Sequence, residues 1–253
     1  ITLDDLERPD LPAYKLYIFA NLFYLSAEER ARLEQLLTGS GATALWIYAP
    51  GYLDDQSASV QNMQALTGIR FGMDESHGTI NVHITNFDHP VTCRLFQGSV
   101  YGTGVDLEQY LRPPQIQYLP DMRFSPAFFA EDLDALVLGC LEVGGNRTQK
   151  AGLVVKQQSG WRSIYSAAPL LPWELMRDIA RFAGVHLYNE TGDMIWANNA
   201  FVALYSQSEG RRTLHFPHRA EVEDAYTGEK LGDGLEAVDL ELARWETRIF
   251  LMR

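Results

Sequence analysis

The sequence predicts an α/β fold, in which a mostly parallel sheet carries helices on both faces and a small antiparallel β-domain follows. Short apolar segments at residues 14–20 and 43–49 alternate with helical patterns at 26–37 and 57–66, which is typical of a parallel sheet covered on both sides. After Gly184, by contrast, only short alternating segments between turn residues remain. Such segments are typical of antiparallel strands.

Local signals justify the first elements in order. Ser26 is an N-cap residue, and Glu29 stands three residues later at the capping-box position, so a helix is expected to begin there. Pro50 and Gly51 end the second apolar strand. Gly68 follows the second helical pattern, where a glycine commonly ends a helix.

The middle of the chain is less regular. Residues 98–126 are rich in glycine, proline and tyrosine, which indicates a long surface excursion. Further strands are expected at 79–85, 91–95, 135–141, 152–156 and 161–166, and a helix at 173–182. The C-terminal strands are expected at 194–197, 200–205, 211–216, 220–224, 234–240 and 248–252.

These patterns predict three segments of the chain. Residues 1–13 are expected to be a linker or a truncated first unit, 14–185 the α/β domain and 186–253 the small antiparallel β-domain. The chain begins Ile1-Thr2-Leu3 without a methionine, so we expect it to be part of a longer protein.

Composition excludes several classes of function. The chain of 253 residues has 33 acidic and 21 basic side chains and a net charge of −12, so we expect no nucleic-acid partner. No apolar run approaches the roughly 18 to 20 residues of a membrane span, so we expect no membrane partner. Two cysteines, Cys93 and Cys140, are too few for a disulfide framework. We expect a cytoplasmic, bacterial protein.

No strong catalytic, cofactor or metal signature is present in the sequence. Gly102-Thr103-Gly104 lacks the third glycine of a phosphate loop, and the histidines have no metal-ligand spacing. We therefore expect no catalytic residue, no cofactor and no metal. Glu142, which ends an apolar segment, remains a candidate ligand-binding residue because acids at strand ends often form sites.

Two alternatives remain open. The first is a self-contained enzyme, either a divergent hydrolase that uses Glu142 or an amidase that uses Cys140, although that cysteine lies in an apolar run typical of an inert thiol. The second is a carbohydrate-binding module with Trp161, Trp196 or Tyr188 as stacking residues.

Several segments carry a resemblance to a known family. They are Lys15-Leu16-Tyr17-Ile18-Phe19-Ala20-Asn21, Leu25-Ser26-Ala27-Glu28-Glu29, Trp46-Ile47-Tyr48-Ala49-Pro50-Gly51-Tyr52-Leu53, Phe87-Asp88-His89-Pro90-Val91-Thr92, Gly160-Trp161-Arg162-Ser163-Ile164-Tyr165, Thr213-Leu214-His215-Phe216-Pro217, Val222-Glu223-Asp224-Ala225-Tyr226-Thr227-Gly228 and Thr247-Arg248-Ile249-Phe250-Leu251. Together they resemble the class I glutamine amidotransferase-like trimerisation domain, a flavodoxin-like fold, and the C-terminal β-domain of glycoside hydrolase family 42 β-galactosidases.

The resemblance implies a non-catalytic region of a glycosidase-like protein. Where an amidotransferase has its cysteine, this chain has Ala49-Pro50-Gly51, which supplies no nucleophile. The resemblance further implies a homo-oligomer, by analogy a trimer, a catalytic barrel missing from this chain, and a possible carbohydrate partner. In an open α/β sheet a ligand would bind at the carboxyl ends of the strands, which makes Asn21, Gly51 and Tyr52 candidate ligand-binding residues.

Overall fold

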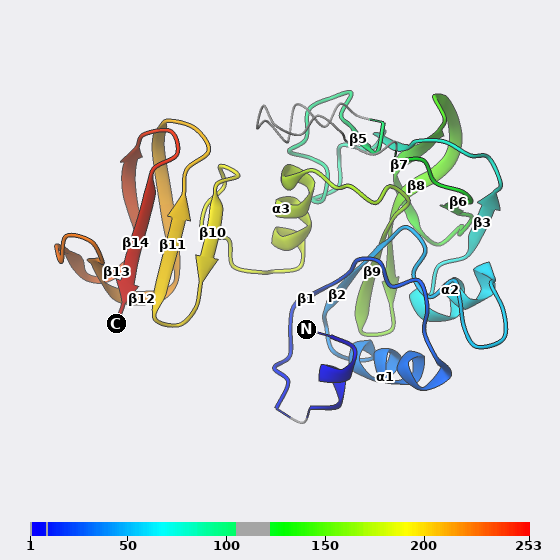
Figure 1. The fold of residues 1–253 in the computed structure, drawn as a ribbon, viewed down its shortest axis with the longest axis horizontal. Coiled ribbons are helices and arrows are strands. Elements are labelled where there is room, and N and C mark those ends of the chain that lie inside the picture. The colour runs from blue at the N-terminus through cyan, green and yellow to red at the C-terminus, as the bar shows by residue number, and fades with distance from the viewer. Residues whose placement is uncertain (1, 9, 105–121) are drawn as a thin grey trace. The chain divides into compact units, whose positions relative to one another are not determined.

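The computed structural model describes residues 2–8, 10–104 and 122–253. The chain divides into two units, Ile1–Gly184 and Val185–Arg253, each with its own sheet (Figure 1). Each unit also has its own hydrophobic core. Of the surface excursion expected at 98–126, residues 105–121 lie outside the described part. Within the described residues, no helix combines the length and the apolar character that crossing a bilayer requires.

Unit 1 contains a mixed sheet that curls into a half-barrel. Its main path runs β1-β2-β9-β8-β7-β4-β5, while β3 pairs with β6 and β6 also pairs with β8. The strands are β1 (Leu16–Phe19), β2 (Thr43–Ile47), β3 (Phe71–Asp74), β4 (Ile80–Ile84), β5 (Val100–Gly102), β6 (Ala127–Ala130), β7 (Leu136–Val143), β8 (Asn146–Gln158) and β9 (Trp161–Ser166). Among the described strands, the β1–β2 and β2–β9 pairs are parallel, and the other pairings in this sheet are antiparallel.

The predicted fold class is therefore wrong. Strands make up 43% of the structure and helices 14%, so this is not a helix-covered, flavodoxin-like or amidotransferase-like sheet. The reason lies in the connections, since a parallel neighbour requires a long crossover whereas an antiparallel neighbour requires only a tight turn. Gly144 and Gly145, with φ of 57° and 81°, form such a turn between β7 and β8. Residues 91–95, expected to be a strand, form turns instead.

The helices are η1 (Asp4–Glu7, a 3-10 helix), α1 (Ala27–Leu37), α2 (Val60–Thr67) and α3 (Trp173–Phe182). The capping box predicted for α1 is complete, because Ser26 Oγ accepts from the Glu29 N–H and the Glu29 carboxylate accepts from the Ser26 N–H. Gly68 ends α2 in the left-handed conformation, with φ of 70°. Leu3 and Leu6, from the predicted linker segment, pack against the core of unit 1.

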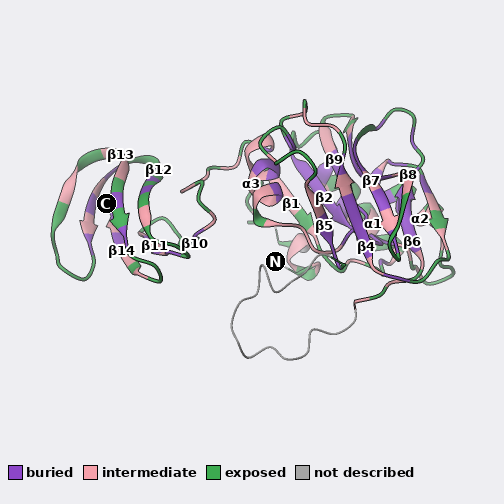
Figure 2. Ribbon diagram, turned by 90° about the horizontal axis from the view of Figure 1, so that it is seen from above, coloured by how far each residue is buried: buried purple, intermediate pink, exposed green. Residues whose placement is uncertain are grey.

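The core of unit 1 is centred on aromatic side chains of neighbouring strands, and the buried stretches follow the inner strands of the sheet (Figure 2). Trp46 is fully buried, and Phe19 of β1 stacks on it with ring centroids 4.3 Å apart. The indole Nε1 of Trp46 donates a hydrogen bond to Ser163 Oγ at 3.1 Å, which satisfies the one polar atom of the ring. The parallel strands β1, β2 and β9 are thus joined by side chains as well as by their backbone ladder.

Unit 2 is a five-stranded antiparallel sheet in the order β10-β11-β14-β12-β13. Its strands are β10 (Met194–Ala197), β11 (Phe201–Tyr205), β12 (Gly210–Asp224), β13 (Lys230–Leu242) and β14 (Thr247–Met252). Val202, Leu214 and Phe250 belong to its own buried core. A buried ion pair joins Arg212 Nε to Asp193 Oδ2 at 2.6 Å.

Candidate functional site

The loops that follow β1 and β2 lie against each other, because the carboxyl ends of parallel neighbours meet at the same edge of a sheet. The Gly51 N–H donates to the Leu22 carbonyl at 2.6 Å, and the Leu53 N–H donates to the Phe23 carbonyl at 2.9 Å. A parallel bridge also pairs Tyr24 with Leu53. The structure therefore brings the loops that hold Asn21, Gly51 and Tyr52 together at one edge of the sheet.

Two of these three residues shape the loop backbone. Asn21 has a φ of 58° and Gly51 a φ of 59°, and asparagine and glycine tolerate this left-handed region better than other residues. A Cβ atom on Gly51 would lie 2.9 Å from Arg30 Nη1 and 2.9 Å from Leu66 Cδ2. Only Tyr52, which is half-buried, contributes a side chain to the cluster described next.

We call the strand-end cluster the set of side chains that pack around Tyr48 at this edge; its members are Phe23, Tyr48, Tyr52, Met73, Phe124 and Phe128. The Tyr48 ring makes edge contacts with three members, at centroid distances of 5.0 Å to Phe124, 5.5 Å to Phe128 and 5.8 Å to Phe23. Tyr52 lies 4.8 Å from Phe128, and its hydroxyl donates to Met73 Sδ at 3.5 Å. The segments that follow β1 and β2, together with β3, β6 and the residue Phe124 before β6, thus contribute to one aromatic cluster.

Tyr48 occupies an unusual backbone conformation at the centre of this cluster. Its φ is 64°, a value that costs energy for a residue with a Cβ atom. Three hydrogen bonds of 2.8 Å hold it: its N–H donates to the Ser166 carbonyl, its carbonyl accepts from Tyr165 Oη, and its own hydroxyl donates to the Pro126 carbonyl. Nothing in the sequence indicated this role of Tyr48, because a left-handed φ has no signature in a tyrosine.

Burial keeps both tyrosine hydroxyls of this network protonated. Desolvation raises the pKa of the Tyr165 hydroxyl well above its usual value, and it also raises the pKa of Tyr48. A neutral hydroxyl is a hydrogen-bond donor, which is the role both groups have here. The network therefore stabilises a shape and supplies no nucleophile or base.

The loops that follow β1 and β2, which we call the strand-end loops, expose apolar side chains to solvent beside acidic ones. Phe23, Tyr24, Leu53 and Met73 are 36%, 48%, 40% and 41% exposed. The Tyr24 hydroxyl donates to Asp55 Oδ1 at 2.5 Å. Hydrogen bonds from the Gln56 and Ser57 N–H groups hold the pKa of neighbouring Asp54 below its usual value. This combination of aromatic rings and carboxylates suits packing against a protein surface or a sugar.

Arg30 of α1 holds the loop that follows β2. Its guanidinium donates to the carbonyls of Asn62 at 2.8 Å, Gly51 at 2.5 Å and Leu53 at 3.2 Å. Partial burial of this guanidinium lowers its pKa. The loop that presents Tyr52 is therefore held in place by a helix of the scaffold.

Glu142, the fourth predicted site residue, belongs to a different cluster on β7 and β4. Its Oε1 accepts from Asn81 Nδ2 and its Oε2 pairs with His83 Nε2, both at 2.7 Å. Burial alone would raise the pKa of this carboxyl, but these two hydrogen bonds and the charge of Arg147 together hold it below its usual value. An ionised carboxylate with both oxygens engaged is poorly suited to be the general acid of a glycosidase.

Cys140 lies directly opposite His83 in the β4–β7 ladder and is half-buried. Within the described residues, its thiol makes no hydrogen bond, while Nε2 of His83 is paired with Glu142. A cysteine nucleophile needs a base within hydrogen-bond reach, so this arrangement does not support an amidase. In the same part of the chain, no group of three or more histidine, cysteine or acidic side chains is placed to hold a metal.

The three aromatic residues considered for carbohydrate stacking have different environments. Trp161 is half-buried and contacts Trp46, with centroids 6.5 Å apart. Tyr188 packs against the core of unit 2, whereas Trp196 of β10 is 52% exposed. Trp196 is therefore the one of the three that presents a large open ring to solvent.

Comparison with known proteins identifies the architecture. No protein-family model matches the chain, and no curated protein matches it. Several solved structures of β-galactosidases do match it over nearly its whole length. That of Bacillus circulans sp. alkalophilus has a TM-score of 0.61 at 14% identity, over 95% of this chain and 33% of that chain.

Two further β-galactosidases agree. A family 42 enzyme from G. stearothermophilus has a TM-score of 0.55 at 16% identity, over 95% of this chain and 32% of that one. The enzyme of the haloarchaeon Halorubrum lacusprofundi has a TM-score of 0.54 at 13% identity, over 96% of this chain and 32% of that one. The chain thus spans about a third of the length of these structures, and its resemblance to a region of family 42 β-galactosidases is confirmed at the level of the fold.

Proposed function

We propose that this chain is a non-catalytic region of a glycoside-hydrolase-like protein and that it assembles copies of that protein through the strand-end loops. The observation that carries the proposal is the exposure of Phe23, Leu53 and Met73 at one edge of unit 1. Apolar side chains that a scaffold holds exposed are typical of interaction surfaces. The net charge of −12 makes an apolar contact the more favourable one, because acidic surfaces of two copies repel.

A carbohydrate role follows from the same surface. The exposed Tyr24 ring lies beside Asp55, to which its hydroxyl donates, and such a pair of ring and carboxylate can stack on and hydrogen-bond to a sugar. When a second copy packs on this edge, these side chains would close the rim of a sugar site that the neighbouring copy supplies. The catalytic acids would then belong to a barrel outside this chain, in a cytoplasmic bacterial protein, and the assembly would be a trimer.

Light scattering on the 253-residue chain over a micromolar concentration range tests the assembly. We expect a mass above that of the monomer, with three copies as the limit. The double variant Phe23→Ser/Met73→Ser is expected to weaken association about tenfold or more, since each buried apolar side chain contributes about 1.5–3 kcal/mol.

The matched control is Leu133→Ser, which removes a side chain that is 92% exposed elsewhere in unit 1. This variant should associate like the unaltered chain. A strict monomer at every concentration, or a double variant that associates as well as the control, would contradict the proposed assembly.

A further inference from the structure

The sheet of unit 2 carries a set of uncharged side chains on the face that points away from its core. Val202, Leu204 and Phe250 belong to that core, and successive side chains of a strand point to opposite faces of the sheet. The residues that alternate with them therefore lie on the outer face. We call these residues the outer platform; its members are Met194 and Trp196 of β10, Phe201, Ala203 and Tyr205 of β11, and Thr247, Ile249 and Leu251 of β14.

Ala203 lies at the centre of the outer platform. It is the register partner of Trp196 on one side and of Ile249 on the other. Phe201 and Tyr205 stand two residues away from it along β11, on the same face. Because alanine carries only a methyl group, it leaves room beside the larger side chains around it. The Trp196 ring is accordingly 52% exposed.

Two hydroxyl groups lie next to this aromatic surface. Tyr205 and Thr247 are register partners, so their side chains are neighbours on the outer face. Within the described residues, neither hydroxyl makes a hydrogen bond. The outer platform therefore combines an open indole ring with hydroxyl groups that are available to a ligand.

The charge of the outer platform favours a neutral ligand. None of its eight members is charged, so it provides no partner for a cationic or an anionic group. Leu251 is bordered on β12 by Glu223, its register partner, and the chain as a whole has a net charge of −12. Both would repel an anion.

The size of the outer platform favours a small ligand over a second protein. Three strands about 4.8 Å apart, with five residues of about 3.4 Å each, cover roughly 10 Å by 14 Å, which is on the order of 150–200 Å². A stable protein interface buries about 800 Å² on each partner. The platform is therefore too small to hold two copies together but large enough for a short oligosaccharide.

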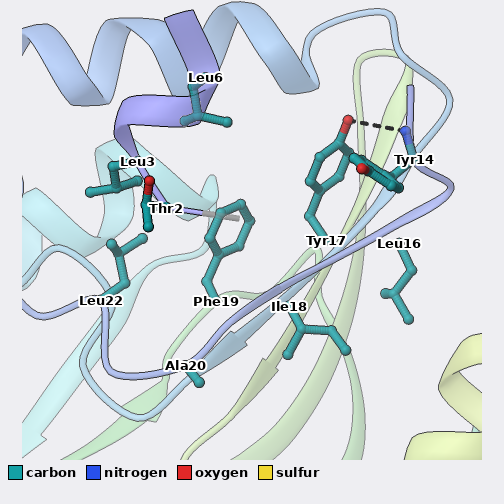
Figure 3. Close-up of a pocket in the computed structure, with 10 residues that line it drawn as sticks. All are labelled: Thr2, Leu3, Leu6, Tyr14, Leu16, Tyr17, Ile18, Phe19, Ala20 and Leu22. Carbon is teal, nitrogen blue, oxygen red and sulfur yellow. Dashed lines mark hydrogen bonds between the residues drawn. The ribbon is translucent and has the colours of Figure 1, made fainter. Parts of the chain in front are cut away.

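The cavity beside β1 in unit 1 is less suited to a sugar (Figure 3). Its lining is mostly apolar and includes Leu6. The Tyr17 hydroxyl already accepts from the Tyr14 N–H at 3.2 Å, and the Thr2 hydroxyl already donates to Asp5 Oδ2 at 3.1 Å. The outer platform of unit 2 thus offers the better chemistry for carbohydrate recognition.

We propose that the outer platform binds a neutral oligosaccharide, with one pyranose ring stacked on Trp196. The C–H face of the pyranose would pack on the indole and extend over Ala203, because aromatic rings bind apolar surface at a low entropic cost. The hydroxyl groups of the sugar would bond to those of Tyr205 and Thr247, which fix its orientation. The proposal does not depend on the strand-end loops of unit 1.

Nuclear magnetic resonance of the isotope-labelled 253-residue chain tests the proposal. The probes are cellotetraose, xylotetraose and galactotetraose, each titrated at millimolar concentration. We expect at least one of them to shift the Trp196 indole signal and the Ala203 and Tyr205 amide signals in a saturable way. The indole signal of Trp161 in unit 1, which is half-buried against Trp46, should not move.

Three variants locate the binding. Trp196→Ala should abolish it, and Tyr205→Phe should weaken it about fivefold, since it removes one hydrogen bond and keeps the ring. Ala203→Leu should also weaken binding, because the larger side chain fills the room beside Trp196. The matched control is Trp173→Ala, which removes a tryptophan that is 40% exposed in unit 1 and should leave binding unchanged.

Three results would overturn the proposal. The first is that none of the tetrasaccharides shifts the Trp196 signal at millimolar concentration. The second is that Trp196→Ala binds a sugar as well as Trp173→Ala does, which would place the site elsewhere. The third is a shift of the same signals without sugar that grows with protein concentration, which would show that the outer platform contacts a second copy.

Discussion

The hydroxyl of Tyr165, on β9, donates a hydrogen bond of 2.8 Å to the carbonyl of Tyr48 at the end of β2. This bond crosses the two parallel strands at the point where the chain turns into the strand-end loop with a φ of 64°. The same hydroxyl lies 3.3 Å from the Phe128 carbonyl on β6. One buried phenol therefore joins the parallel and antiparallel parts of the half-barrel beneath the proposed interaction surface.

We expect Tyr165→Phe to destabilise unit 1 without changing its fold. The substitution removes the donor and leaves the Tyr48 carbonyl without this partner, at a cost of about 1–3 kcal/mol. Urea unfolding followed by tryptophan fluorescence would measure it. Tyr205→Phe in unit 2 is the control, because the Tyr205 hydroxyl makes no hydrogen bond within the described residues. Equal stability of the two variants would show that the bond is energetically unimportant.

A second prediction concerns the loss of stability when Gly51 receives a side chain. Gly51→Ala should cost roughly 2–4 kcal/mol, because the new Cβ adds steric contacts with Arg30 and Leu66 to the cost of the left-handed conformation. Gly39→Ala, where φ is also positive at 70° but no atom lies within 4 Å of the Cβ position, should cost only about 1–2 kcal/mol. Thermal unfolding of both variants measures the difference. Similar losses in the two would mean that the Arg30 contact can relax freely.

The sequence was sufficient to predict features that depend on residues close together in the chain. The start of α1 followed from Ser26 and Glu29, whose side chains and backbone groups are only three residues apart. The left-handed end of α2 at Gly68 followed in the same way. Such signals depend on local geometry and need no knowledge of the rest of the fold.

Strand direction could not be predicted in this way. An apolar segment such as β7 or β9 has the same composition in a parallel and in an antiparallel sheet once both of its faces are covered. The direction depends on which strands become neighbours, and that is decided by tertiary packing. The turn at Gly144-Gly145 was the available signal, since two adjacent glycines favour a hairpin between the segments on either side.

Only part of the candidate site could be predicted, because some of its residues come together only through tertiary packing. Asn21, Gly51 and Tyr52 were chosen because they follow strands, and β1 and β2 are parallel, so their loops do adjoin. Tyr48 and Phe128 were missed because they come together only when β6 packs over the end of β2. Glu142 was chosen as a strand-end acid, yet its oxygens bond to Asn81 and His83 in the neighbouring strand.

A third prediction concerns Arg30. Arg30→Lys keeps the charge but loses the planar fork that reaches three carbonyls, so the loop carrying Gly51 and Leu53 should open more often. We expect the amides of these two residues to exchange about tenfold or more faster, which corresponds to a loss of about 1.4 kcal/mol or more. Arg32→Lys on the same helix, whose partner Glu28 is exposed, should leave the loop unchanged. Unchanged exchange rates of the Gly51 and Leu53 amides in Arg30→Lys would contradict the role proposed for the Arg30 guanidinium.

The last prediction uses the acid pH dependence of Glu142. Its pKa in the folded chain lies below the usual value, so its contribution to stability is present above the unfolded pKa of about 4.3 and is lost as the pH falls through the folded value. Glu142→Gln should therefore be less stable than the unaltered chain at pH 7, by about 1 kcal/mol. This difference should shrink toward zero as the pH falls below about 4.

Urea unfolding from pH 7 down to pH 3 measures both chains, and Glu131→Gln is the control because the Glu131 carboxylate is exposed and makes no ion pair in the described part of the chain. A loss in Glu142→Gln that stays constant down to pH 3 would show that shape, not charge, determines the effect. A stability loss that becomes smaller as the pH falls would show that the bonds from Asn81 and His83 stabilise the fold by holding an ionised carboxylate. Such a carboxylate is a structural partner of two strands, which argues against Glu142 as the acid of a self-contained hydrolase.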